Sequence, residues 1–435
     1  MKKTIFSIIT VAAVISCSKN LEPDIPDDNQ QPIETIINST YSVDEALANL
    51  NSFYESCGFM TKSPATINEI IAISNYPTAE TKSTNSTDSL LYIVNYAGNN
   101  GFAVLAADRR IPTDILAVGE YGNLQEEDFI ISASDSTFSL ERLIMDYAAY
   151  SIGTITDTVA GLEPYGPEEH PITQINDDYV YIEGEWASTH WGNWKTTDEV
   201  PAMLMTQWGQ GSPYKDMTGA QYAGCGVTAV AQMLAYNQYP ALLDDMRIPY
   251  DTLRKMRHVY TNSAFADDVA ALFKHIFLGC KAKPYGEDGT LVWPKNIAPY
   301  LKELGYKNVD IYRHPSKCNN EIIYASLDKG YPVLITATTD NFHGHTWVID
   351  GYMKQFRSGS SIGVKTGRNY GTKYEYRDLM HCNWGKSGEN NGYYYAGIFE
   401  SYEPAVIPTT KGESDGYYKS FYRIITYEIP EQHNL

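Results

Sequence analysis

With 435 residues the chain is long for one domain, and at about 150 residues per domain two or three domains are expected. Charged residues make up 20% and apolar residues 43%, a normal globular balance that excludes global disorder. The net charge of −20 argues against nucleic acid as a partner, because a phosphate binder needs a basic face.

The first residues form a targeting segment. Lys2 and Lys3 supply the positive start, and residues 5–15 are apolar but too few to span a bilayer as a mature helix. The sequence Val14-Ile15-Ser16-Cys17 that follows resembles a bacterial lipoprotein signal. We therefore expect residues 1–16 to be removed and lipid to be attached to Cys17; the alternative is an ordinary secretory signal that contains a cysteine.

The expected location follows from this segment. No other stretch is apolar and long enough for a transmembrane helix, so the lipid is the only expected membrane contact. The sequence predicts an exported bacterial lipoprotein that is anchored in the outer membrane or at the cell surface. If maturation cuts the chain between the anchor and the enzyme, the enzyme would be released. Residues 17–38 are acidic and rich in proline, and they predict a disordered tether.

A small α+β domain is predicted over residues 39–155. Apolar residues at helical spacing predict a helix over residues 43–53, with Ser42 as its N-cap. Runs of apolar residues predict strands over 90–96, 102–107 and 115–118, with a turn at residues 98–101 between the first two. Residues 156–195 are less regular, with prolines, glycines and acidic clusters, and they predict a connection that carries the activation cleavage.

A second, larger domain is predicted over residues 196–435. One helix begins near Cys225, and another over residues 320–329 is closed by Gly330. The strands predicted after it cover residues 333–339, 346–350, 376–383 and 393–399, and the 35 tyrosines favour β-rich structure. Helices first and strands afterwards indicate a two-part α+β domain with a cleft between the parts.

The six cysteines show no CxxC pair, which argues against a zinc site or a redox motif. If Cys17 carries lipid, five remain, and an odd number in an exported chain leaves at least one free thiol. The six are Cys17, Cys57, Cys225, Cys280, Cys318 and Cys382.

Cys225 is the strongest candidate for a reactive thiol. It lies in Gly224-Cys225-Gly226-Val227-Thr228, where a glycine turn runs into a stretch with apolar residues at helical spacing. The dipole and free N–H groups of a helix N-terminus favour an anion, so the sequence predicts that this thiol ionises below its reference pKa of about 8.5. A thiolate is a nucleophile, which points to an enzyme.

A nucleophilic cysteine needs a base, and His345 is the best placed histidine because it opens a predicted strand beside Gly344. His343 is the rival. A metal site at this pair is not expected, because no nearby Asp, Glu or His spacing completes one, and no cofactor is implied.

The remaining candidates would orient the base and hold the oxyanion. Asn383 could accept an imidazole N–H, and Trp384 could shield that bond from water. Gln210 could donate to the oxyanion together with the Cys225 backbone N–H. Gln207 and Gln221 are competitors for that role that periodicity does not exclude.

Four motifs in this order resemble the streptopain family of papain-like cysteine peptidases. They are Gln210 with Pro213-Tyr214, residues 224–232, Gly344-His345 through residue 351, and residues 381–385. Residues 101–110 resemble the inhibitory propeptide of the same family. The departures are Gly226 and Val230 beside the thiol, Lys215 after Pro213-Tyr214, and Lys386-Ser387-Gly388 in place of a second tryptophan and paired glycines.

The resemblance implies a papain-like catalytic domain, with a helical part and an antiparallel β part, behind a small α+β inhibitory prodomain. It implies a cysteine endopeptidase made as a zymogen, with Cys225 as nucleophile, His345 as general base and acid, Asn383 and Trp384 orienting His345, and Gln210 completing the oxyanion hole. The expected partners are protein or peptide substrates and the chain's own propeptide, which acts as an intramolecular inhibitor.

Two other functions stay open at this stage. One is a catalytically silent surface lipoprotein that uses the cleft to bind protein or peptide. The other is an amidase or transglutaminase that uses the same Cys–His pair on a glutamine amide.

Overall fold

The computed structural model describes residues 40–57, 66–74, 89–129, 174–176, 179–182, 185–285, 289–313, 320–338, 344–399 and 422–430, and parts of 140–151. Thr40–Leu435 forms one compact unit. The signal peptide, Cys17, the tether, His343 and Cys318 lie outside the described residues. We call residues 40–151 the N-terminal part and residues 201–430 the C-terminal part.

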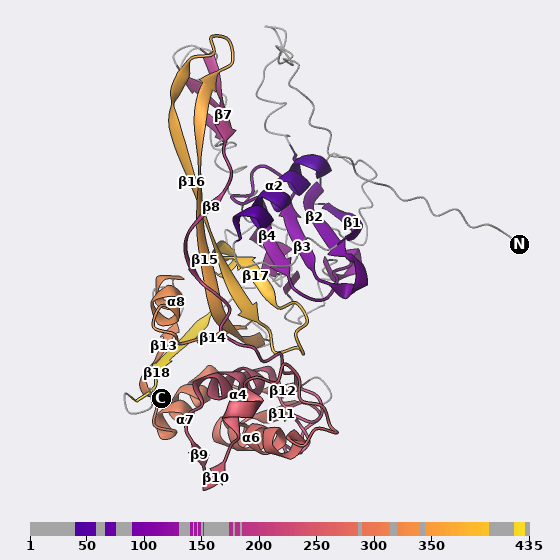
Figure 1. Ribbon diagram of the computed structural model, residues 1–435, viewed down its shortest axis with the longest axis vertical. Helices are drawn as coiled ribbons and strands as arrows, with labels where there is room; N and C mark the ends of the chain where they lie inside the picture. Colours follow the sequence, from indigo (N-terminus) through magenta and orange to yellow (C-terminus); the bar gives the residue numbers. More distant parts are fainter. Residues whose placement is uncertain are drawn as a thin grey trace, which may run out of the picture. The chain divides into compact units, whose positions relative to one another are not determined.

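In the N-terminal part, one helix covers an antiparallel sheet (Figure 1). The helix α2 (Val43–Ser56) begins at Ser42, whose side chain and that of Glu45 form a reciprocal capping box. Its buried face carries Ala46, Leu50 and Phe53. The sheet has the order β1-β2-β3-β4, with β1 (Ile67–Ser74), β2 (Ser89–Tyr96), β3 (Phe102–Ala106) and β4 (Ile115–Gly119). The predicted helix and three strands are confirmed, and β1 was not predicted.

The first half of the C-terminal part is helical. The helices are α4 (Cys225–Asn237), α5 (Tyr250–Leu253), α6 (Ala266–Gly279) and α7 (Pro294–Glu303), with two short hairpins, β9–β10 (Leu242–Leu243, Met246–Arg247) and β11–β12 (Lys283–Tyr285, Gly289–Leu291). Figure 1 shows α4, α6 and α7 grouped together, and they enclose a core that includes Val230, Phe273 and Leu301. Only α4 was predicted among these helices.

The second half of the C-terminal part is an antiparallel sheet of order β17-β16-β15-β14-β18-β13. Its elements are β13 (Lys307–Arg313), α8 (Asn320–Leu327), β14 (Val333–Thr338), β15 (Gly344–Gly363), β16 (Asn369–Asn383), β17 (Gly392–Tyr395) and β18 (Arg423–Glu428). The predicted α8 and β14 are confirmed. The predicted strands 346–350 and 376–383 are confirmed as parts of the much longer β15 and β16. The strand predicted over 393–399 is wrong in its second half, because the chain turns into a 3-10 helix, Ala396–Phe399, after β17.

The connection between the two parts is more regular than predicted. It contains β5 (Gln174–Asn176), β6 (Tyr179–Ile182), β7 (Glu185–Trp191) and β8 (Lys195–Val200). Both β7 and β8 pair with β15, so the expectation of a less regular segment over 156–195 is wrong for residues 185–191 and for Lys195, where β8 begins. No residue of β8 is buried, and the strand exists because β15 supplies its hydrogen bonds.

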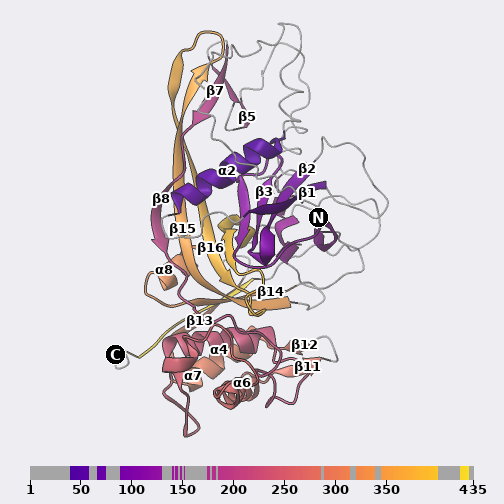
Figure 2. The ribbon, with the colours of Figure 1, turned by 45° about the vertical axis from the view of Figure 1, so that its right-hand side comes forward.

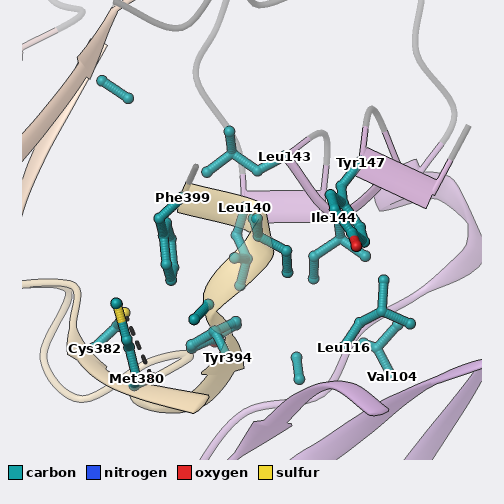
Figure 3. Packing of buried hydrophobic residues seen from close by; sticks show 14 of the residues in the cluster. Val104, Leu116, Leu140, Leu143, Ile144, Tyr147, Met380, Cys382, Tyr394 and Phe399 are labelled. Carbon is teal, nitrogen blue, oxygen red and sulfur yellow. Dashed lines mark hydrogen bonds between the residues drawn. The ribbon is translucent and has the colours of Figure 1, made fainter. Parts of the chain in front are cut away.

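One sheet joins the two parts of the chain, because β4 pairs with β17. Gly392 permits this pairing, since a Cβ there would lie 2.1 Å from the Val118 carbonyl oxygen. The core is shared as well. Figure 3 shows Val104, Leu116 and Ile144 of the N-terminal part in one cluster with residues of the C-terminal part, among them Met380, Tyr394 and Phe399.

Candidate active site

Cys225 is the first residue of α4, as the sequence predicts. The turn before it needs glycine, because Gly224 has a φ of 98° and a Cβ there would lie 2.9 Å from the Thr290 carbonyl oxygen. Gly226, a departure from the family pattern, is explained by packing: its Cβ would lie 2.8 Å from that of Val292. Cys225, a half-buried residue, is thereby placed at the N-terminus of α4.

His345 lies at the start of β15, also as predicted. The backbone N–H of the next residue, Thr346, donates to the Cys225 Sγ over 3.4 Å. The helix start and the strand start therefore meet at the thiol, although 121 positions separate Cys225 from Thr346 in sequence. The predicted nucleophile and the predicted base are neighbours in this fold.

The imidazole of His345 is buried, and its Nε2 lies 2.8 Å from the carbonyl oxygen of Trp384. A carbonyl oxygen only accepts, so Nε2 carries the proton of this bond. The ring is also stacked near Trp347 and Trp384, whose own rings lie 4.7 Å apart between centroids. Trp384 thus contacts the imidazole through both its backbone and its indole.

Asn383 is fully surrounded by protein. Its Oδ1 accepts from Gln232 Nε2 over 3.0 Å and from the Gly385 N–H over 3.2 Å, while its Nδ2 donates to the Thr206 carbonyl over 2.7 Å. In this structure the hydrogen bond on the His345 Nε2 is therefore supplied by Trp384 and not by the Asn383 amide oxygen that the sequence suggested.

Gln232 was not singled out from the sequence, yet it ties the site together. It is buried two helical turns after Cys225, and its Oε1 accepts from the Trp208 N–H over 3.0 Å. Its Nε2 holds Asn383, so one side chain joins α4, the segment before Gln210 and the end of β16. Residue 232 lies five positions after Val227, about 140° around the helix, so the predicted apolar face gave no signal for it.

Gln210 lies close to the start of α4, because its carbonyl accepts from the Ala223 N–H over 2.9 Å. Thr228 adds a second tie, since its Oγ1 lies 3.2 Å from the Gly209 carbonyl oxygen. The rival Gln221 is exposed, and the rival Gln207 is half-buried.

The loop that contains Lys386 packs on the same segment. The Ser387 N–H donates to the Trp208 carbonyl over 3.3 Å, and a Cβ at Gly209 would lie 2.2 Å from the Ser387 Oγ. The exposed Lys386 side chain places its positive charge near both Cys225 and His345.

The electrostatics of this state differ from the sequence-based prediction. Burial raises the pKa of the Cys225 thiol, although the N–H groups around the sulfur favour the thiolate. Burial also lowers the pKa of the His345 imidazole to about 3, and the charge of Lys386 adds to this effect. The prediction that Cys225 ionises below its reference pKa is wrong for this state, because the loss of solvent outweighs the helix N-terminus.

The N-terminal part reaches this site through Asn391. The Asn391 carbonyl accepts from the Glu120 N–H over 2.7 Å, just beyond β4. Its side-chain Oδ1 accepts from the Trp384 N–H over 2.9 Å. A continuous path therefore runs from Glu120 through Asn391 and Trp384 to His345.

Other features of the described residues bear on the sequence predictions. Cys57, Cys225, Cys280 and Cys382 are free thiols there. Within the same residues, no His, Cys, Asp and Glu side chains gather into a group that could hold a metal ion. No described helix is long and apolar enough to cross a membrane.

Comparison with known proteins gives two family matches. Residues 208–394 match the model described as the Peptidase C10 family, and residues 41–139 match the model described as Spi protease inhibitor. No curated protein matches the chain.

Five chains of solved structures match this chain. One of them is a mutant fragment of prointerpain A from Prevotella intermedia, 18% identical, with a TM-score of 0.50 over 83% of this chain and 100% of that one. This similarity agrees with the α+β architecture, in which a helical part and an antiparallel β part follow an N-terminal inhibitor-type domain. The chain is thus a cysteine peptidase of the streptopain family, with a peptidase domain of the C10 type behind an inhibitor-type prodomain.

Proposed function

We propose that the protein is an exported cysteine endopeptidase zymogen, in which Cys225 is the nucleophile, His345 the base and acid, and the N-terminal part the inhibitor. One observation carries the proposal. The thiol at the start of α4 lies against the first residues of β15, which include His345, with 3.4 Å between the Cys225 Sγ and the Thr346 nitrogen. This brings together a sulfur, an imidazole and the N–H groups of a helix N-terminus, which are the groups that acyl transfer needs.

The tautomer of His345 suits it for the task. Because Nε2–H donates to Trp384, the lone pair of the neutral ring is on Nδ1, and this nitrogen would take the thiol proton of Cys225. The thiolate would then attack a peptide carbonyl, and the imidazolium would protonate the leaving amine. Water, deprotonated by the same imidazole, would hydrolyse the thioester and regenerate the thiol.

The oxyanion and the orientation of the base are assigned to neighbouring groups. The Cys225 backbone N–H and the Gln210 side chain would donate to the oxyanion, which is consistent with the bond that holds Gln210 beside α4. Trp384 would orient the imidazole together with Asn383, which Gln232 fixes from behind. The positive Lys386 near the thiol would favour the thiolate once the site is solvated.

Latency would follow from burial of the pair. A thiol with a raised pKa and an imidazole with a pKa of about 3 are both neutral near pH 7, so the reactive ion pair is not favoured in this state. The path from Glu120 to His345 supports the view that the N-terminal part holds the closed arrangement. Removal of this part would release Asn391 and let water reach the site.

Export by a lipoprotein signal is part of the proposal, with residues 1–16 removed and Cys17 lipidated. Globomycin, which blocks lipoprotein signal cleavage, is expected to make a longer precursor accumulate, and Cys17→Ser is expected to move the protein out of the membrane fraction. Cys57→Ser, at a buried thiol, is the matched control. An unchanged distribution of the Cys17→Ser protein would argue for an ordinary secretory signal.

The catalytic proposal is tested by incubating the wild-type chain and Cys225→Ala side by side. Intact mass spectrometry follows processing, and casein hydrolysis follows activity. We expect the wild type to mature and cleave casein, and Cys225→Ala to do neither, while Cys280→Ala, at a buried thiol in the helical part, behaves like the wild type.

An epoxide directed at papain-like thiols separates the alternative functions. A silent binding protein would give no adduct on Cys225 after the prodomain is removed. An amidase or transglutaminase would be labelled, but it would act on glutamine amides and leave the casein backbone intact.

A further inference from the structure

The hairpin of β15 and β16 continues well past the strands that flank it. β14 pairs only with residues 344–349 of β15, and β17 only with residues 379–382 of β16. Beyond them, residues 354–363 and 369–378 form what we call the arm, which stands out in Figures 1 and 2. Residues 185–200, which we call the strap, run along the arm through β7 and β8.

Two arginines lie side by side on one face of the arm. Arg377 is paired with Gln355 across the two strands, and Arg357 is paired with Glu375. The two pairs are two positions apart, so all four side chains point to the same face. Arg377 is only 2% exposed, and its Nε donates to the Gln355 Oε1 over 2.8 Å.

The strap covers these arginines with tryptophan rings. The guanidinium carbon of Arg377 lies 4.1 Å from the centroid of the Trp194 ring, and that of Arg357 lies 4.6 Å from it. Trp191 adds a second ring, 5.0 Å from Arg357. Aromatic faces of this kind hold guanidinium groups in place while leaving their N–H donors free to bind an anion.

A single carboxylate from the N-terminal part fills the space. Asp114, just before β4, forms a buried ion pair with Arg377 Nη1 through its Oδ1. Its Oδ2 accepts from the Trp194 Nε1 over 3.1 Å and lies 3.8 Å from the Arg357 Nη1. Three donors from the arm and the strap thus converge on one carboxylate. The Arg377 Nη2, which is also buried, has no hydrogen-bond partner among the described residues.

This receptor belongs to the arm and the strap, whereas Asp114 and the Phe53 ring, whose centroid lies 5.4 Å from the Arg377 guanidinium carbon, belong to the N-terminal part. Glu375 neutralises Arg357 by an ion pair, which leaves Arg377 with Asp114 as its carboxylate. When the N-terminal part leaves, the donors of Arg377 and Trp194 lose their acceptor. A guanidinium that is held against tryptophan faces and has lost its carboxylate can bind another carboxylate through its N–H donors.

We propose that Arg377, Arg357 and Trp194 form an exosite that Asp114 occupies before activation and that an acidic side chain of a protein substrate occupies afterwards. This inference rests on the proposed function, because it requires an active peptidase that has lost its prodomain. The exosite is carried on the strands that bear the catalytic residues. Arg377 precedes Asn383 by six residues, which correspond to about 20 Å of extended strand.

The test uses mature wild-type enzyme and fluorogenic peptides that share one cleaved sequence. A neutral spacer of two or eight residues joins that sequence to a tail of three aspartates or three asparagines, on the N-terminal side in one series and on the C-terminal side in another. Eight extended residues span about 26 Å and reach the exosite, whereas two do not. In one of the two series we expect the aspartate tail to raise kcat/KM about tenfold with the long spacer and not with the short one, mainly through KM.

Arg377→Met should abolish the preference for the aspartate tail. Arg368→Met, which removes an exposed charge from the tip of the same arm, should keep it. The ratio of the two tails within each protein is the readout, so differences in overall activity cancel. The wild-type comparison of spacers needs no variant and stands even if Arg377→Met fails to fold.

Equal rates for both tails with the long spacer, in both series, would overturn the exosite and leave the peptidase intact. A preference retained by Arg377→Met would overturn it as well. If wild-type enzyme cleaves none of the peptides and no casein, the proposed function fails instead.

Discussion

Asp114 is the position at which one substitution should do most to release the latent enzyme. The buried carboxylate is 4% exposed and neutralises Arg377, which is 2% exposed. Removal of one partner of a buried ion pair destabilises the folded state by about 3–5 kcal/mol, because the remaining charge is left uncompensated. We take about 3 kcal/mol for Asp114→Ala, since Gln355 and Trp194 still contact Arg377. At 1.4 kcal/mol per factor of ten, the fraction of chains with the N-terminal part displaced should rise about 100-fold.

Active-site labelling of the full-length chain measures this fraction. An epoxide directed at the Cys225 thiol reacts only when the site opens, so the initial labelling rate should rise about 100-fold in Asp114→Ala. Asp44→Ala, at an exposed carboxylate of the same part, should stay within about twofold of the wild type. The double variant Asp114→Leu/Arg377→Met should lie closer to the wild type than Asp114→Ala does, because no unpaired charge remains. A folded Asp114→Ala protein that is labelled at the wild-type rate would refute the reasoning.

Three further outcomes are expected. The mature enzyme should keep its strap, because β7 and β8 are paired strands that cannot enter a protease cleft. N-terminal sequencing should find a start at or before Glu185, and a start at any later residue would contradict this. Burial opposes a charge on His381, but the charge of Asp350 outweighs burial and raises the pKa of His381 from 6.5 to about 10. The contribution of this pair to the free energy of unfolding should therefore be full below pH 6.5 and be lost as the pH rises through 10. Chemical unfolding at pH 6 and pH 10.5 should show a smaller fall for His381→Gln than for the wild type, and equal falls would exclude this pair as the cause. Gln232→Ala should lower kcat about tenfold or more and the free energy of unfolding by about 1–3 kcal/mol. If the substitution raised KM and left kcat unchanged, Gln232 would not position the catalytic groups.

The elements that could be predicted are those whose signals are local. Ser42 and Glu45 form a capping box, which marks the start of a helix. The buried strands of the N-terminal part are continuous apolar runs. The strap and the arm give no such signal. β8 is polar and mostly exposed, and it owes its strand to pairing with the distant β15. Residues 354–363 mix charged, small and glycine residues, and they owe their strand to pairing within the hairpin and with the strap.

The candidate site divides in the same way. Placement of Cys225 at a helix start and of His345 at a strand start follows from turns and periodicity nearby. The pKa of the Cys225 thiol cannot be predicted in this way, because it depends on burial by the tertiary fold. The bond from Trp384 to the imidazole and the role of Gln232 link segments that no local pattern brings together.

The pairing of β4 with β17 has a consequence for the enzyme once its prodomain is gone. Loss of β4 would turn β17 into an edge strand, with unpaired N–H and C=O groups, and would uncover Tyr393 and Tyr394, which are now 1% and 0% exposed. The apolar residues that packed on Val104 and Leu116 would face solvent at the same time. A freshly activated molecule would therefore expose an unpaired strand edge and an apolar surface where its inhibitor had been. Both would favour rebinding of the cleaved inhibitor until that fragment is digested.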